Sequence, residues 1–495
     1  MSQFPFVGQA YEAPMLVQDA EKCVNWYVEI SQNGESKTPS SLLGTPGLLN
    51  LLTVGSGPIR GCWTLPGGAA AIVVSGAAVY WVTQRSTPAG VAGITLAATQ
   101  IGSLLTSSGP VCIRDNGAGG IAVIVDGPNG YVVNLTAKTV TQITDPAWLG
   151  SDRVAFIDGW LVFNEPGSQT FYTSPLYWNG KTAMDASYFS LKDSSSDQLV
   201  TMHENIRELW LVGERTSEVW FDAGNATFPF SRLQGVTPQQ GCAAKHSIAR
   251  ISDAQRGVDS LIWLGANERG QNAVKRTFGY QIVDVSTIAV NHAIASYPVT
   301  SDAIGYVYQQ DEHEFYVLTF PTADVTWVWD VTTNMWHERA SYDPVAGLFH
   351  RHLSNCVMNF AGVTIVGDCS SGNLYQLSRQ VYTDNGNPLV AWRRTPHVWD
   401  KNNRERVFHS QLQIEFTPGV GVQTGQGSSP QAVLRWSDDG GQTWGNEHWR
   451  SIGMAGQTKN RCIWRRMGQA RDRVYDVKFS DPVPRDVVGA SLIAV

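Results

Sequence analysis

Short apolar runs separated by tight turns recur along the whole chain, and this pattern constrains the fold more than any other feature. Residues 154–157 and 160–163, for example, flank the dipeptide Asp158-Gly159. Both turn positions tolerate positive φ, which suits a two-residue hairpin. The runs are β-branched or aromatic and short, and helical periodicity is hard to find anywhere. The sequence therefore predicts an all-β protein.

The spacing of these runs suggests a repeat. Runs begin near residues 69, 121, 209, 261, 315 and 363, at intervals of 52, 88, 52, 54 and 48 residues, and one more run, at 154, falls inside the long interval. Steps of roughly 50 residues match one four-stranded propeller blade. We expect residues 61–390 to form a β-propeller-like domain of about six blades, some of them irregular. Unrelated strands of a large sandwich are the alternative.

The two ends of the chain differ from this middle part. Residues 1–60 are rich in Pro, Asn and Gly and carry only short apolar runs, so we expect an extended arm that docks on the C-terminal module. Residues 391–495 read as a second β module, whose Gly-rich segment 419–430 is a flexible loop by composition. This module carries 15 Lys and Arg against 10 Asp and Glu, whereas residues 1–390 carry 21 against 33. An acidic body thus precedes a basic module.

Composition excludes several classes of protein. Charged residues make up 16% of the chain, and the 18 Trp and 16 Tyr are more than disorder tolerates. A net charge of −7 argues against a nucleic-acid binder with a basic footprint over the whole protein. The seven scattered cysteines include no CxxC pair, which predicts free thiols in a reducing compartment. No secretory signal and no apolar run of membrane-spanning length is visible, so we expect synthesis in the cytoplasm without membrane insertion.

The sharpest local motif is an Asp-box in the C-terminal module. The segment Ser437-Asp438-Asp439-Gly440-Gly441-Gln442-Thr443-Trp444 fits the pattern Ser-x-Asp-x-Gly-x-Thr-Trp of sialidase-type propellers. In such a turn Asp439 accepts backbone N–H groups, Gly441 adopts positive φ and Trp444 folds back as an apolar anchor. We interpret Ser437, Asp439, Gly441, Thr443 and Trp444 as a structural turn. Ligand binding is the alternative.

Signals for catalysis, metals and cofactors are thin. Glycosidases need two carboxylates across a sugar, or a Tyr nucleophile, and no arginine cluster in the propeller half supports such a site. His350 and His352 would share a strand face, but no further ligand stands at metal spacing, so a polar face or interface is expected. Glu312-His313-Glu314 fits a turn before the strand that begins at Phe315. The phosphate-loop, zinc and nucleophile-elbow motifs are missing. We therefore expect no catalytic residue, metal or cofactor.

Two basic clusters with interleaved tryptophans remain in the C-terminal module. They could follow a nucleic-acid backbone, form a solvated face, or pair with acidic groups of a neighbouring subunit, since Arg and Trp are enriched at protein interfaces. We favour subunit contacts, because the same chain supplies 33 acidic residues upstream. The candidate interface residues are Arg393, Arg394, Arg404, Arg406, Arg461, Trp464, Arg465, Arg466, Arg471 and Arg473.

Segments at both ends of the chain resemble a phage family. They are Phe-Pro-Phe-Val-Gly-Gln-Ala-Tyr at 4–11, Cys-Val-Asn-Trp-Tyr-Val-Glu at 23–29, Leu-Gly-Thr-Pro-Gly-Leu at 43–48, the Asp-box with its preceding Trp at 436–444, and Trp-Arg-Arg-Met-Gly-Gln-Ala-Arg-Asp-Arg-Val at 464–474. The family is the packaged-DNA stabilisation proteins of short-tailed phages, also called tail hub or nozzle proteins. The motifs are specific together and weak singly, and the middle of the chain is supported by pattern only.

The resemblance implies a virion structural protein without catalysis, located in the phage tail and made in the bacterial host cytoplasm. It implies a ring, a hexamer, below the portal and its adaptor ring, which extends the DNA channel and carries tailspikes or fibres beside a tail needle or plug. Contact with double-stranded DNA would be transient, and a net negative charge suits a channel through which DNA slides. The runner-up is a receptor- or carbohydrate-binding tail protein, and an enzyme comes third.

Overall fold

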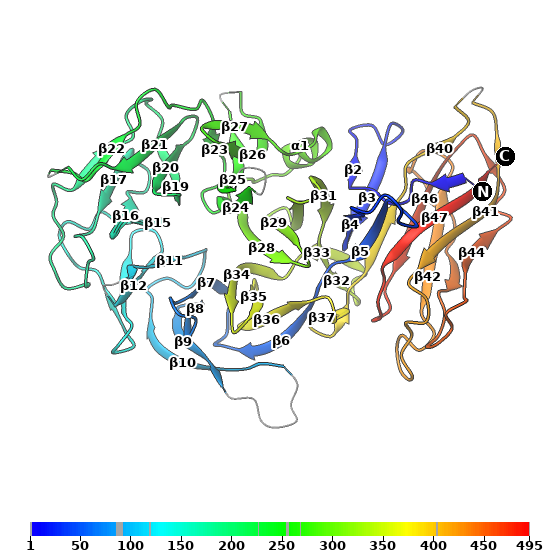
Figure 1. Ribbon diagram of the computed structural model, residues 1–495, viewed down its shortest axis with the longest axis horizontal. Helices are drawn as coiled ribbons and strands as arrows, with labels where there is room; N and C mark the ends of the chain where they lie inside the picture. Colours follow the sequence, from blue (N-terminus) through cyan, green and yellow to red (C-terminus); the bar gives the residue numbers. More distant parts are fainter. Residues whose placement is uncertain are drawn as a thin grey trace.

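The computed structural model describes residues 2–85, 93–117, 120–225, 227–253, 257–267, 269–401 and 404–494. Nearly all regular structure in these ranges is β, as the sequence predicts, and one short helix, α1 (Ile288–Ala295), is present. The Thr287 side chain caps α1 by accepting a hydrogen bond from the Val290 N–H. Figure 1 shows two bodies side by side: a ring of small sheets and a two-layer β-sandwich that holds both chain termini.

Seven antiparallel sheets around a common centre form a β-propeller, and neighbouring sheets touch through their first strands. The first four blades are β7 (Ile59–Thr64), β8 (Ala70–Ser75), β9 (Ala78–Arg85) and β10 (Thr95–Ser103); β11 (Cys112–Asp115), β12 (Ile121–Val125), β13 (Gly130–Asn134) and β14 (Thr139–Gln142); β15 (Val154–Ile157), β16 (Trp160–Asn164), β17 (Thr170–Thr173) and β18 (Phe189–Leu191); β19 (Leu199–Asn205), β20 (Glu208–Gly213), β21 (Ser217–Asp222) and β22 (Phe230–Arg232).

The last three blades are less regular. They are β23 (Gly241–Cys242), β24 (Ala249–Asp253), β25 (Val258–Ala266), β26 (Asn272–Phe278) and β27 (Gln281–Asp284); β28 (Ile304–Gln310), β29 (His313–Phe320), β30 (Val325–Asp330) and β31 (Met335–Glu338); β34 (Ser354–Phe360), β35 (Val363–Asp368), β36 (Asn373–Ser378) and the N-terminal strand β6 (Gly47–Thr53), with β37 (Thr383–Asp384) and β38 (Asn387–Pro388) at its edge. A separate hairpin joins β32 (Ala340–Asp343) to β33 (Leu348–Arg351).

The structure has one blade more than the six or so that the spacing suggests. Each run identified in the sequence lies in its own blade, and the run at 154 forms a complete blade inside the 88-residue interval. Residues 1–60 also differ from the expected arm. The segment 47–53 is the outer strand of the last blade, where Leu48 pairs with Leu377. Short strands like this one are invisible as repeats because their partners lie more than 300 residues away.

The C-terminal residues form a sandwich of two sheets to which the N-terminal segment adds strands. One layer contains β1 (Ser2–Phe4), β4 (Trp26–Ile30), β5 (Ser40–Gly44), β47 (Val487–Ala494), β41 (Val407–Phe416), β44 (Cys462–Arg465) and β45 (Gln469–Ala470); the other contains β2 (Tyr11–Glu12), β3 (Ala20–Val24), β39 (Ala391–Arg394), β40 (Val398–Trp399), β46 (Asp472–Phe479), β42 (Gln431–Ser437) and β43 (His448–Ser451). Aromatic side chains pack between the layers, with the rings of Phe416 and Phe479 5.8 Å apart and those of Phe4 and Tyr475 6.0 Å apart.

One sheet runs without a break from the propeller into the sandwich. β3 lies parallel to β31 of the sixth blade on one side and antiparallel to β39 on the other, which makes an eleven-stranded sheet. Asn25, buried at the end of β3, reinforces the junction. Its side-chain amide donates to the carbonyls of Ala340 and Val390, each at 2.8 Å, and its Oδ1 accepts from the Ala340 N–H. A single apolar core follows this sheet through both bodies.

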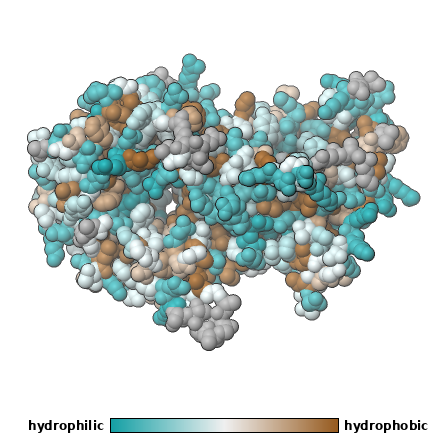
Figure 2. All heavy atoms as spheres, viewed as in Figure 1, coloured by the Kyte–Doolittle hydropathy of each residue, from teal (hydrophilic) through white to brown (hydrophobic). Residues whose placement is uncertain are grey.

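The surface seen in Figure 2 is mainly hydrophilic, with apolar side chains scattered in small groups. Of the 18 tryptophans, only Trp399 and Trp449, both on the sandwich, are exposed; the other 16 are buried or half-buried. The aromatic content therefore serves mainly the core and the packing between blades.

Candidate functional site

The Asp-box forms the turn after β42 in the sandwich. Asp439 accepts hydrogen bonds from the backbone N–H groups of Gln442 and Thr443 and from the Ser437 hydroxyl at 2.6 Å. The Ser437 hydroxyl in turn accepts from the Gly441 N–H at 2.8 Å, and Gly441 has a φ of 96°. Hydrogen bonds from Ser437 and Thr443 lower the pKa of Asp439 below its ordinary value. The Ser437 hydroxyl and the Asp439 carboxylate are thus engaged within the turn.

Trp444, the last residue of the motif, lies between two arginines. Its ring is 4.6 Å from the guanidinium carbon of Arg394 and 5.0 Å from that of Arg435. Both arginines also bond to Asp476, which is buried between them. The tryptophan therefore closes a cation–π and ion-pair stack on the outside of the sheet. It anchors the turn, and we propose a structural role for the motif.

Replacing Asp439 with alanine will lower the melting temperature of the protein by a few degrees and leave any glycan binding unchanged, because the carboxylate bonds only within its own turn. Differential scanning calorimetry checks the shift. Gln442→Ala is the matched control, since its exposed side chain makes none of these bonds and the turn keeps its backbone donors. An unaltered melting temperature accompanied by lost glycan binding would assign the motif to a ligand instead.

Four of the ten candidate interface residues are buried inside the chain, and for these the expectation of subunit contact is wrong. Arg393, fully buried, donates to the carbonyls of Phe6 at 2.7 Å and of Gln9 and Lys22 at 3.0 Å, and pairs with Glu21. Burial raises the pKa of Glu21, and the Arg393 charge acts against that rise. Arg393 is therefore the side chain that fixes the N-terminal segment to the sandwich.

The other three buried candidates also have partners within the chain. Arg394 pairs with Asp476 and Glu12. Arg473 donates to both oxygens of Asp438, at 2.6 and 2.8 Å, and to the Met467 carbonyl at 2.7 Å. The indole N–H of Trp464 donates to the His448 carbonyl at 2.9 Å. A neighbouring subunit cannot reach groups that are already desolvated and satisfied in this way.

The remaining six candidates are exposed on the sandwich: Arg404, Arg406, Arg461, Arg465, Arg466 and Arg471. Among the described residues, none of the six forms an ion pair with a carboxylate. Arg465 and Arg466 are held in place by the sheet: Arg465 lies opposite Gln411 and donates to its side chain at 3.2 Å, and the Arg466 N–H donates to the Ser410 carbonyl at 3.0 Å. These six arginines, which we call the arginine edge, form a surface with unpaired positive charge.

Apolar side chains that the sequence analysis did not single out accompany the arginine edge. Phe408 on β41 is 59% exposed. Trp399, Arg404 and Arg471 line a surface cavity of about 490 Å³ together with His397. The pKa of His397 is raised, chiefly by its bond to Asp472 at 2.8 Å. By alternation Phe408 would share the buried face of Leu412 and Ile414, but the register of β41 shifts between His409 and Gln411 and leaves Phe408 exposed, which the sequence does not signal.

The histidine motifs separate in space. His350 bonds to Asp324 at 2.6 Å near the surface, whereas His352 is buried and bonds to the Ser354 hydroxyl at 2.6 Å. His313 begins β29, after a turn at Asp311 and Glu312, and bonds to Asp330 and Glu29. Across the described residues no group of three or more His, Cys, Asp or Glu side chains is placed to hold a metal ion.

In the same ranges no helix is long and apolar enough to cross a membrane.

Comparison with protein families agrees with this architecture. A family model described as Bacteriophage P22 Gp10, beta-propeller, matches residues 54–382, and a second, described as Bacteriophage P22 Gp10, beta-sandwich, matches residues 392–494. The chain belongs to the bacteriophage P22 Gp10 family. The resemblance to packaged-DNA stabilisation proteins is thereby confirmed, as is a propeller followed by a C-terminal β module. As a Gp10-family protein it is a structural protein of the phage virion that stabilises packaged DNA.

Solved structures resemble this Gp10-family chain only distantly. The Pan2 WD40 domain of Neurospora crassa is 9% identical, with a TM-score of 0.42 over 68% of this chain and 96% of that one. The extracellular domain of the putative hybrid two-component system BT4673 from B. thetaiotaomicron is 9% identical, with a TM-score of 0.41 over 82% of this chain and 47% of that one. No curated protein sequence matches the chain.

Proposed function

We propose that this Gp10-family protein is a tail hub of a short-tailed phage and acts without catalysis. In this proposal six copies form a ring below the portal and adaptor proteins, extend the DNA channel, carry tailspikes or fibres beside a tail needle or plug, and retain the packaged genome. The observation that carries it is the arginine edge. Its unpaired positive charge is available to an acidic partner, and residues 1–390 of the same chain have an excess of 12 acidic residues.

A contact between two different surfaces of identical chains is heterologous, and it closes into a ring when the rotation between copies is right. The arginine edge of one protomer and an acidic surface of the next would form such a contact. The net charge of −7 would repel the DNA backbone, so that DNA in a channel through the ring passes without adhering. The ring would retain the genome because it and its partner proteins close the channel, and not because it binds the DNA.

Particles assembled without this protein will package DNA and then lose it. The proposal places the protein after packaging, as part of the structure that closes the channel. The test is to quantify the DNA retained in purified particles from a null mutant, with particles complemented in trans as the control. Full, stable but non-infectious particles would contradict the hub and point to the alternative, a receptor- or carbohydrate-binding tail protein.

One observation favours that alternative. The cavity beside Trp399 combines an exposed aromatic face with the guanidinium groups of Arg404 and Arg471, and sugars stack on such faces. Only two of the 18 tryptophans are exposed, however, so the abundance of tryptophan does not itself support a binding surface. The hub therefore remains the function proposed.

A further inference from the structure

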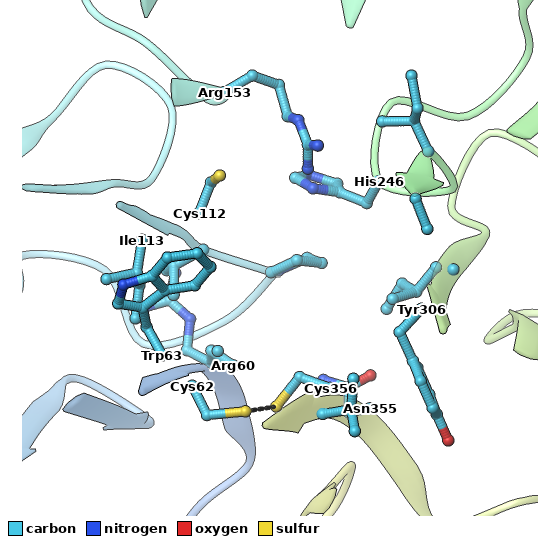
Figure 3. Close-up of a pocket in the computed structure, with 18 of the residues that line it drawn as sticks. Arg60, Cys62, Trp63, Cys112, Ile113, Arg153, His246, Tyr306, Asn355 and Cys356 are labelled. Atoms are coloured by element: carbon cyan, nitrogen blue, oxygen red, sulfur yellow. Dashed lines mark hydrogen bonds between the residues drawn. The ribbon is translucent and has the colours of Figure 1, made fainter. Parts of the chain in front are cut away.

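A cavity on the axis of the propeller has an unusual set of charged walls. Figure 3 shows its lining, which comes from the innermost strands or inner loops of all seven blades. The cavity has a volume of about 280 Å³, whereas a water molecule occupies about 30 Å³ in the liquid. Among the described residues, its lining contains four arginines and two histidines but no carboxylate; these are Arg60, Arg114, Arg153, Arg250, His203 and His246.

Three of the four arginines have counter-charges behind the cavity wall. Arg60 donates to three backbone carbonyls and lies 3.9 Å from Asp126. Arg114 pairs with Glu204 at 3.4 Å, and Arg250 pairs with Asp259 at 3.2 Å. These three arginines are held in place and partly neutralised by their partners. They line the cavity with positive charge but do not themselves require a ligand.

Arg153 is different. Only 8% of this residue is exposed, and its side chain makes no hydrogen bond or ion pair with any described residue. The nearest acid along the chain, Asp152, is already engaged by Lys245 and by the Asn164 amide at 2.8 Å. The Nε of its guanidinium is buried without a hydrogen-bond partner, and a charged group that is buried without a direct partner is costly.

Burial is the main cause of the lowered pKa values of the two histidines that line the cavity, and arginine charges add to it. In Figure 3 the Arg153 guanidinium lies beside the His246 ring on one side of the cavity. Burial and the Arg153 charge lower the pKa of His246 to about 3. Burial likewise lowers the pKa of His203 to about 4, with Arg114 and Arg153 contributing, although Glu204 opposes this shift. Both imidazoles are therefore neutral at pH 7.

We propose that the axial cavity binds a phosphate-class oxyanion, with Arg153 as its principal ligand. A guanidinium presents parallel N–H donors that match two oxygens of such an anion, and the arginine walls supply the surrounding positive potential. The volume admits inorganic phosphate together with water. A phosphate monoester that enters from one mouth of the cavity presents the same oxygens. The inference is independent of the hub function, because it concerns the propeller axis and not the arginine edge.

Isothermal titration calorimetry of the full-length protein with inorganic phosphate, in a phosphate-free low-salt buffer, tests this site. We expect saturable binding at one site per chain. Arg153→Gln should weaken it by at least about tenfold, the value of a hydrogen bond to a charged group. Arg207→Gln, which removes an exposed arginine elsewhere on the propeller, is the matched control and should bind as the unchanged protein does. Heats that do not saturate, or equal affinity in the Arg153 variant, would overturn the proposal.

The stability of the variant provides a second readout. Without phosphate, the melting temperature of Arg153→Gln should be no lower than that of the unchanged protein, because the change removes an uncompensated charge. Added phosphate should raise the melting temperature of the unchanged protein only. If the glutamine variant does not fold, Arg153→Lys keeps the charge but loses the paired donors, and unchanged affinity in that variant also refutes the site. Adenosine monophosphate and adenosine distinguish the source of the phosphate: binding of the nucleotide alone indicates a monoester, and equal binding of adenosine would overturn the assignment.

Discussion

Replacing both Arg465 and Arg466 with glutamate will abolish assembly of the protein on portal-bearing particles while each protomer still folds. The two side chains are exposed and have no carboxylate partner among the residues that the structure describes. If they pair with acidic groups of a neighbour, the double change places like charges together. If the interface buries these pairs, loss of each one costs about 2–5 kcal/mol, and six such contacts would be lost around a hexameric ring.

The fold should tolerate this change. Arg466 has a φ of 59°, but glutamate is no more restricted there than arginine, and the backbone bond to Ser410 is kept. Circular dichroism and the melting temperature of the isolated protein check this. Arg85→Glu with Arg269→Glu is the matched control, because it makes the same change in charge at exposed positions of the propeller. Normal assembly with altered genome retention or ejection would favour DNA-facing arginines instead.

Arg393→Ala will destabilise the protein by about 3–5 kcal/mol, the cost of removing one partner of a buried ion pair. The change leaves Glu21 without its counter-charge and three backbone carbonyls without a donor. Packing here is close: a Cβ added at Gly8 would lie 2.9 Å from the Arg393 guanidinium. Urea denaturation measures the loss, and limited proteolysis should show the first strands released.

Arg461→Ala is the control for this experiment. It removes an exposed arginine from the same module, and surface changes of this kind stay within about 0.5 kcal/mol. Should Arg393→Ala unfold at the same urea concentration as this control, with the N-terminal strands still protected, the bonds of Arg393 to the N-terminal segment would not stabilise the protein. The comparison separates loss of a buried network from loss of charge alone.

Much of the fold follows from local pattern. All seven apolar runs found in the sequence are strands of separate blades, because buried propeller strands are β-branched and stand between glycine-containing turns. The pairing of β6 with β36, and of β3 with β31 and β39, could not be predicted. Such pairings join residues hundreds of positions apart, and the short strands involved carry no signature of their partners.

The clustering of arginines along the sequence does not show which of them are exposed on the surface. Arg465 is exposed and Trp464 is buried, as alternation along a strand requires, but Arg473 shares its side of β46 with Tyr475 and Val477 and is buried with them. Alternation alone does not separate the two groups, because the consecutive Arg393 and Arg394 are both buried and the consecutive Arg465 and Arg466 are both exposed. The axial cavity has no such signal, because seven blades each contribute one or a few residues to it.

The unbroken sheet between the two bodies determines how a load passes through the molecule. A pull on the sandwich reaches the sixth blade through backbone hydrogen bonds of β39, β3 and β31, with Asn25 bonded on both sides of the seam. Paired strands, and not a flexible linker, join the two bodies at this point, so we expect the propeller and the sandwich to move as one rigid unit. In the proposed ring, movement during genome release would then occur at the contacts between protomers and not by bending within one.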